Sequence, residues 1–192
     1  MRSSTIAIIV AGVLVAASGG TVVALLARDD PGTNPARWRT ETLTADGVPA
    51  LPVSLHVAPA GCPGFSLSSP APGSRFNKPG AWSHLVTIAP GHSTLWVCLG
   101  TVEETGGARA SVVHQLGVRE DVTSFDPVLV STPIGEVARV DRAFGPDAAP
   151  RLTDWLVDHG GYTYAVGYLH PTGEQQHYET VEAMIASVAW DQ

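Results

Sequence analysis

The residues of this sequence best able to bind a metal or transfer protons are its seven histidines. Their spacing contains no HxH, HxxxH or HExxH pattern, the arrangements that place two ligands on one side of an element. The best constellation is His170 and His177 with Glu174 and Glu179 nearby. We expect surface or capping roles for these side chains, and we predict neither a metal nor a cofactor.

A nucleophile could come from His92-Ser93, which lies in a turn that contains glycine. The sequence has no GxSxG elbow, the strained turn that exposes the serine of many hydrolases. We therefore predict that the protein is not an enzyme. A secreted envelope hydrolase that uses this Ser/His pair is the alternative function.

Two further patterns suggest a catalytic or an anion-binding site less strongly. Asp154 and Asp158 flank Trp155 and could suggest the paired carboxylates of a glycoside hydrolase. On a strand they would share one face at a distance, so we expect a solvated edge instead. Gly106-Gly107 precedes a predicted helix and would suit an anion, but it lacks the phosphate-binding glycine patterns, so we expect a loop.

Tyrosines gather near the end of the sequence. Tyr162, Tyr164 and Tyr168 share one face of a predicted strand with Val166, and with Tyr178 they could line a groove for an acyl or sugar ligand. We favour the plainer interpretation, in which these rings form the core under the last helix. The ligand groove stays the alternative.

Cys62 and Cys98 are the two cysteines of the sequence. A single pair suits one disulfide in an oxidising compartment, and closing a loop of about 35 residues would stabilise the fold by roughly 4 kcal/mol. The alternative is two unpaired thiols, Cys98 in an apolar strand and Cys62 in a turn. We predict the disulfide.

The uncharged apolar run Thr5–Ala27 precedes all of these candidates. As a helix of about 23 residues it would be about 34 Å long, enough to cross a hydrocarbon core of about 30 Å. We predict an uncleaved transmembrane helix whose partner is the bilayer. A cleaved signal peptide is the alternative, because Val15-Ala16-Ala17 could precede a cleavage site, but the apolar run resumes beyond it.

Small residues recur at every fourth position of this run, a spacing that permits close approach of two helices. These residues are Gly12, Ala16, Gly20 and Ala24. Dimerisation through this face would make the protein a structural assembly subunit, which is a third hypothesis.

The orientation of the run in the membrane does not follow from charge alone, because arginines lie on both sides of it. We expect the large C-terminal part outside the cytoplasm because both cysteines lie there.

Composition and length indicate how the rest of the chain is organised and which partners are excluded. We expect residues 1–4 to form a short cytoplasmic tail, 28–48 a flexible tether, and 49–192 one extracytoplasmic domain. Trp38, in the tether, could rest at the lipid headgroups or pack on the domain. The net charge of -7 argues against nucleic acid as a partner. Arginine is preferred over the single lysine, Lys78, which suggests a bacterial genome of high GC content.

Alternating apolar and polar residues predict an antiparallel sheet. Strands are predicted at 51–58, 65–70, 82–89, 94–100, 125–131, 136–144, 151–157 and 162–170. A loop is predicted over 71–80 and a short helix over 108–116. A capping box of Thr172 and Gln175 predicts the start of a final amphipathic helix, whose apolar face carries Tyr178, Val181, Met184, Ile185 and Val188. The predicted fold class is α+β.

Four segments carry a family resemblance: Phe65-Ser-Leu-Ser-Ser-Pro, Gly135-Glu-Val-Ala-Arg-Val, Tyr162-Thr-Tyr-Ala-Val-Gly-Tyr, and the closing Met184-Ile-Ala-Ser-Val-Ala-Trp190. They resemble the PsbP-like superfamily, including the actinobacterial secreted LpqN-like proteins, over about residues 65–190. The aromatic Trp190 comes two residues later than in that family. The resemblance implies a sheet between helices and a non-enzymatic adaptor or binder, and it transfers no functional residues.

These observations together predict a single-pass, membrane-anchored extracytoplasmic protein of the bacterial cell envelope that binds a protein or a lipid. The anchor would raise the effective concentration of the domain near membrane-associated partners.

Overall fold

The computed structural model describes residues 38–43, 51–59, 61–78, 81–117, 122–124, 126–144, 151–171 and 177–191. The predicted transmembrane helix Thr5–Ala27, its small-residue face, and the capping box of Thr172 and Gln175 lie outside these residues. Among the helices of the described ranges, none has the length and hydrophobicity of a membrane span.

Most of the described chain forms strands. They are β1 (Arg39–Thr42), β2 (Val53–Val57), β3 (Phe65–Ser69), β4 (Ser74–Lys78), β5 (Ala81–Ala89), β6 (His92–Thr101), β7 (Val122–Ser124), β8 (Val128–Thr132), β9 (Gly135–Phe144), β10 (Arg151–His159), β11 (Tyr162–His170) and β12 (Ala189–Trp190). The helices are α1 (Val102–Thr105), α2 (Gly107–Gly117) and α3 (Tyr178–Ala186).

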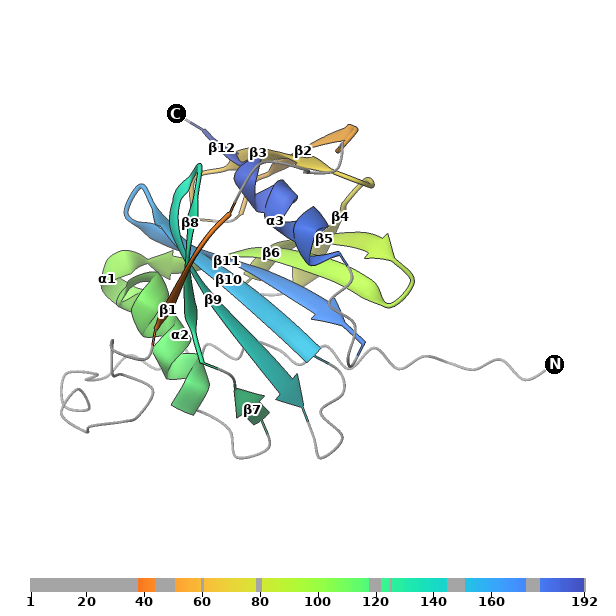
Figure 1. Ribbon diagram of the computed structural model, residues 1–192. Coiled ribbons are helices and arrows are strands. Elements are labelled where there is room, and N and C mark those ends of the chain that lie inside the picture. The colour runs from red at the N-terminus through yellow and green to blue at the C-terminus, as the bar shows by residue number, and fades with distance from the viewer. Residues whose placement is uncertain are drawn as a thin grey trace.

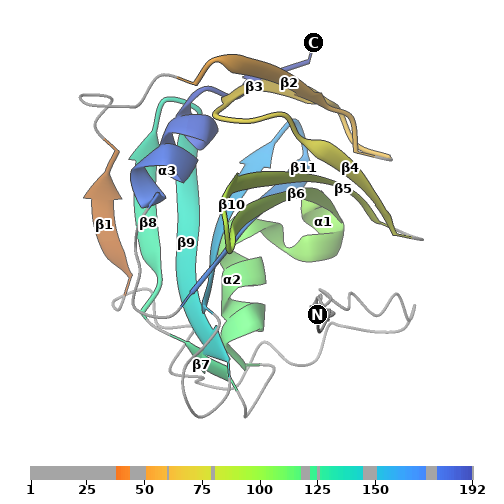
Figure 2. The ribbon, with the colours of Figure 1, turned by 90° about the vertical axis from the view of Figure 1, so that its right-hand side faces the viewer.

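The strands form two sheets. The large sheet has the order β1-β8-β9-β10-β11-β6-β5-β4, with β7 also paired to β9, and the small sheet has the order β12-β3-β2. Pairing is antiparallel except between β1 and β8, which run parallel. Figure 2 shows the large sheet bending, so that β5 and β6 run across the direction of β8 and β9. A mixed fold with a short helix is therefore as predicted, whereas the division into two sheets and the parallel pair β1-β8 were not predicted.

The large sheet has a core on each face because side chains alternate along its strands. On β10, Trp155 and Val157 join the core under α3 and the small sheet, whereas Leu156 joins the core under α2. Figure 1 shows α3 and the small sheet on one side of the large sheet, with α1 and α2 on the other. The apolar face predicted for α3 is confirmed, because Val181 and Met184 are fully buried.

The hairpin between β10 and β11 follows directly from its turn residues. Gly160 and Gly161 have φ angles of 58° and 84°, a backbone conformation that other residues rarely adopt. Tight turns with two positive φ angles match the twist of the strands that they join. This turn sets the register that pairs His159 with Tyr162 and Arg151 with His170.

The stretch predicted to be a tether contains β1. Its four residues, Arg39–Thr42, are polar and show no apolar alternation, but they pair with β8 at the edge of the large sheet. Trp38 packs against the core under α2, and the Arg109 guanidinium lies 6.0 Å from its ring centroid. Of the two interpretations of Trp38, packing on its own domain is therefore the one that the structure has.

Other boundaries also differ from the predictions. The loop predicted over 71–80 contains β4. The turn expected to include His92 and Ser93 ends before them, since β6 begins at His92. Helix α1 was not predicted, although Thr101 and Glu104 form a complete capping box at its start. Helix α3 begins at Tyr178 with His177 as its N-cap, and the His177 side chain makes no capping hydrogen bond.

Candidate functional site

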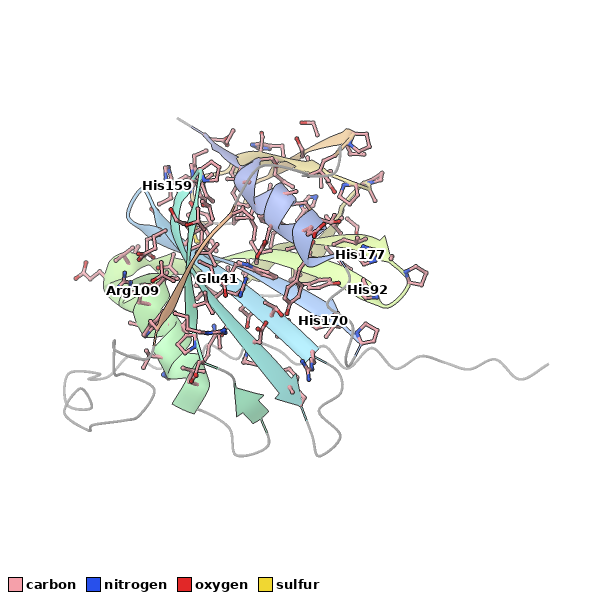
Figure 3. The ribbon with its side chains drawn as sticks, in the orientation of Figure 1. Glu41, His92, Arg109, His159, His170 and His177 are labelled. Atoms are coloured by element: carbon pink, nitrogen blue, oxygen red, sulfur yellow. A yellow bond between two sulfur atoms is a disulfide. The ribbon has the colours of Figure 1, made fainter. Side chains whose placement is uncertain are left out.

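Residues from three separate hypotheses meet where α3 begins. Figure 3 shows His92, His170 and His177 near one another at this end of the molecule, and His159 far from them. The rings of His92 and His177 are 4.9 Å apart, and those of Tyr168 and His170 stack at 4.8 Å. We call this group, together with Tyr178, Thr153 and Asp141, the α3 polar cluster.

His92 enters the cluster from β6. Its Nδ1 lies 2.7 Å from the Tyr168 hydroxyl, and both residues are buried, with 4% and 0% of their surface exposed. Ser93 follows on the same strand and so points to the opposite face. His92 and Ser93 therefore do not form the nucleophile and base pair that the alternative function requires.

The centre of the cluster is the Asp141 carboxylate. Its Oδ1 accepts hydrogen bonds from Thr153 Oγ1 at 2.6 Å and from the Tyr178 hydroxyl at 2.8 Å. The Thr153 and Tyr178 oxygens are 2.5 Å apart. Because Tyr178 lies in the first turn of α3 and Asp141 on β9, these bonds fix the start of the helix on the sheet.

His170 borders the same oxygens. Its Nδ1 lies 3.1 Å from the Pro171 carbonyl oxygen, which can only accept, so Nδ1 carries the hydrogen. Its Nε2 lies 3.4 Å from Thr153 Oγ1. The ring is thus oriented by its neighbours, as in many buried polar networks.

Burial raises the pKa of Tyr178, and the nearby Asp141 carboxylate raises it further. The phenol therefore stays neutral and acts as a hydrogen-bond donor at any ordinary pH. A neutral, doubly engaged hydroxyl is suited to positioning the helix and not to nucleophilic attack.

The His170 and His177 constellation was the best metal candidate in the sequence. Glu174 lies outside the described residues. Within the described part of the chain, no group of three or more His, Cys, Asp or Glu side chains is placed to hold a metal ion.

One turn further along α3, Glu182 meets the sheet through Arg139. The Arg139 guanidinium is 3.0 Å from Glu182 and 2.8 Å from Glu41 of β1, so a single arginine joins β1, β9 and α3. Burial raises the pKa of Glu182 although Arg139 opposes the shift. This ion network continues the contact line that begins at Tyr178.

The two aspartates near Trp155 are engaged elsewhere. Asp154 is buried and forms an ion pair with Arg142, so the expected solvated edge is wrong at this residue. Burial raises the pKa of Asp154, an effect that Arg142 opposes. Asp158 accepts from the Ala108 backbone N–H at 2.9 Å and from Thr163 at 2.7 Å.

The contact made by Asp158 lies next to the glycine pair Gly106-Gly107. Gly106 ends α1 with a φ of 74°, and Gly107 begins α2. The start of α2 receives the Asp158 carboxylate, so the anion that a helix N-terminus favours is supplied by the protein itself.

The chain beyond the last turn of α3 packs against aromatic residues instead. Trp190 lies against His159, Tyr164 and Phe65, with ring centroids 4.2, 4.7 and 5.4 Å away. A small apolar cavity lies beside these rings, with about 10 Å³ of space for the centre of a water molecule. We call it the Trp190 cavity. Such a volume holds about one water and is far below that of a ligand pocket.

The four tyrosines of the predicted groove are divided between these two places. Tyr164 and Tyr168 are buried in the core under α3, Tyr162 packs at its margin, and Tyr178 belongs to the α3 polar cluster. Tyr164 donates its hydroxyl to the Pro63 carbonyl at 3.0 Å, and burial raises its pKa to about 12. The preferred interpretation, a core under the last helix, fits this placement.

The predicted disulfide between Cys62 and Cys98 is present, with the Cα atoms 6.5 Å apart. It ties the loop before β3 to β6, next to the strand that carries Tyr164. The bond therefore holds the small sheet against the large sheet at the end where Trp190 lies.

Sequence reasoning missed the partners that organise the α3 polar cluster and the ion network. Arg139 and Asp141 alternate with Ala138 and Val140 on β9, so they occupy positions that point toward the core under α3. Charged residues at the inward positions of a strand were the available signal, because buried charges need partners.

No family model matches this sequence, and no curated protein matches it. A solved structure from Bacteroides thetaiotaomicron is similar to 67% of this chain, with a TM-score of 0.46 and 14% identity. The match covers 45% of that protein, so this chain spans less than half of its length.

Proposed function

We propose that this chain is a membrane-anchored binding protein of the bacterial cell envelope, with its domain outside the cytoplasm and with no catalytic activity. The observation that carries the proposal is the Cys62–Cys98 disulfide, because such bonds persist in oxidising compartments and are rare in the cytosol. The apolar run Thr5–Ala27 supplies the anchor. A binder or adaptor is also what the resemblance to the PsbP-like superfamily implies.

The positions of the titratable groups support binding over catalysis. The α3 polar cluster uses its hydroxyl and carboxylate groups in bonds that fasten α3 to the sheet. The hydrolase alternative needs His92 and Ser93 on one face, whereas the strand places them on opposite faces. The third hypothesis, an assembly subunit that dimerises through Gly12, Ala16, Gly20 and Ala24, stays a prediction.

The location is tested with the full chain expressed in a bacterium. Spheroplasts are treated with a membrane-impermeant maleimide reagent, with and without a reductant, and the membrane fraction is analysed by mass shift. We expect the protein in the membrane fraction, with Cys62 and Cys98 labelled only after reduction.

The Cys62→Ser variant is the matched control, because its remaining thiol should be labelled without reductant. Labelling of both native thiols without reductant would contradict the disulfide. Protection of the reduced thiols until the cells are lysed would place the domain inside. A mature chain that begins at Ser18 in the medium would replace the anchor with a signal peptide.

A further inference from the structure

We propose that Trp190 occupies a binding site for an acyl chain, and that release of the segment Ala189–Asp191 opens the Trp190 cavity to one acyl chain of an envelope lipid. The proposal rests on the proposed function and names a ligand class for it. The segment Ala189–Asp191 is called the Trp190 segment below.

The lining of the cavity defines the chemistry of the ligand. Its walls come from the large sheet, from α3 and from β3, and their side chains are aliphatic or aromatic. The lining includes Phe65, Trp96, Ile134, Val166, Ile185 and Val188. A charged or strongly hydrated group would lose its solvation in such a place, so a ligand must enter with a hydrocarbon portion.

Trp190 fills the space that such a portion would take. Its indole ring packs between the His159 ring, which is parallel to it within 6°, and the rings of Tyr164 and Phe65. The buried indole Nε1–H has no hydrogen-bond acceptor among the described residues. Moving the ring outward would let this N–H bind water, which lowers the cost of release.

Few bonds hold the Trp190 segment in place. Strand β12 pairs with β3 through two residues, and the Asp191 N–H donates to the Gly64 carbonyl at 3.0 Å. The Asp191 carboxylate lies 2.9 Å from His56 Nε2, and these side chains are 44% and 55% exposed. An ion pair this exposed changes an equilibrium constant by a few-fold at most.

The rim of the cavity is polar where the Trp190 segment meets it. His56 lies exposed beside the segment, Asp191 forms the exposed end of the segment itself, and the His159 ring stacks on Trp190. An acyl chain could therefore enter while its head group stays among hydrated side chains. A domain anchored at the bilayer would lie close to lipids that supply such chains.

The test uses the full chain in phosphatidylglycerol vesicles that contain a diazirine-bearing palmitate. After illumination, mass spectrometry measures the labelled fraction of peptides that contain Phe65 or Ile185. We expect Trp190→Ala to raise this fraction about tenfold, because it removes the residue that competes for the site. Asp191→Ala should raise it about two- to fivefold, since it weakens only the closed state.

Gly64→Ala disturbs the same contact while leaving Asp191 in place. A Cβ at Gly64 would collide with the Asp191 carboxylate and lie 3.2 Å from His56 Nε2, so the carboxylate must turn away from His56; the Cβ would also lie 3.1 Å from the Val57 carbonyl oxygen. This variant keeps Trp190, His56 and Asp191. It therefore tests the proposal even if Trp190→Ala fails to fold. We expect the same two- to fivefold rise, about that of Asp191→Ala.

Trp38→Ala is the matched control, because Trp38 packs on the opposite face of the large sheet. It should leave labelling of the Phe65 and Ile185 peptides at the wild-type level. Equal labelling of wild type, Asp191→Ala and Gly64→Ala would overturn the inference, and so would an equal gain in Trp38→Ala. If the spheroplast experiment fails while Trp190→Ala gains labelling, only the proposed location is lost.

Discussion

At its first turn, α3 meets the sheet through hydroxyl and carboxylate groups, whereas beyond its last turn it borders aromatic and aliphatic side chains. The polar end has short directed bonds from Asp141 to Tyr178 and Thr153. The apolar end has Phe65 against Trp96, Tyr164 and Trp190. Directed bonds specify one register of helix on sheet, while apolar contacts stabilise the fold without fixing a single arrangement.

The difference explains why the two ends suit different roles. Removing one member of a buried polar network leaves the others unsatisfied, so the α3 polar cluster resists change. The Trp190 end can exchange one apolar group for another at small cost, because its contacts are not directional. Ligand exchange is therefore expected at the Trp190 end and not where α3 begins.

The largest expected effect tests the apolar end. Phe65→Ala should lower the free energy of unfolding by roughly 3 to 5 kcal/mol, because it removes a ring with 2% exposure at the meeting point of the small sheet and α3. Urea denaturation followed by circular dichroism measures the change. Phe65→Leu is the control and should cost clearly less. An alanine variant as stable as wild type would show that this ring is not part of the core.

The next largest effect tests the covalent link between the two sheets. Replacing Cys62 and Cys98 together by serine should cost roughly 2 to 4 kcal/mol, since the bond closes a loop of 36 residues in the unfolded chain. Thermal unfolding with and without reductant measures it. The double variant should match reduced wild type. A variant that unfolds like oxidised wild type would contradict a stabilising role for the bond.

A matched pair of hydroxyl deletions compares the two ends directly. Tyr178→Phe should cost about 1.5 to 3 kcal/mol, because its hydroxyl donates to the Asp141 carboxylate. Tyr164→Phe should cost about 0.5 to 1.5 kcal/mol, since its hydroxyl donates to the neutral Pro63 carbonyl. Both values come from chemical denaturation. Equal costs, or a larger cost for Tyr164→Phe, would remove the contrast drawn between the ends.

The smallest effect concerns pH. The pKa of Glu182 is raised in the folded protein, so the folded state binds its proton more tightly than the unfolded state does. Stability from this group is therefore present at low pH and is lost as pH rises above the ordinary glutamate value of 4.5 through the raised pKa.

Glu182→Gln removes this titration, so the stability of wild type relative to the variant should fall as pH rises through that window. Unfolding free energies measured at a series of pH values between acid and neutral provide the check. A relative gain of wild-type stability with rising pH would mean that Arg139 dominates over burial at this site.

Local sequence signals were enough for much of the fold. The alternation in Tyr162–His170 predicted β11, and the spacing of Val181, Met184 and Ile185 predicted the buried face of α3. These features depend on side-chain periods that act over a few residues.

Features that depend on pairing between distant segments were not predicted from the sequence. Strand β1 has a polar sequence and exists because the edge of β8 satisfies its backbone groups. Asp154 was predicted to be exposed, but it is buried because Arg142 on the neighbouring strand forms an ion pair with it. In both cases the partner is set by strand order, which no local pattern encodes.

The sequence by itself determined the periodic elements, the two cysteines able to pair, and the apolar run before the domain. Only the tertiary structure decided which polar residues meet. His92 and Tyr168 are 76 positions apart and are brought together by the pairing of β6 with β11. Asp141 and Tyr178 meet because α3 lies across β9. Such contacts depend on sheet order and helix docking, which are properties of the whole chain and not of any segment.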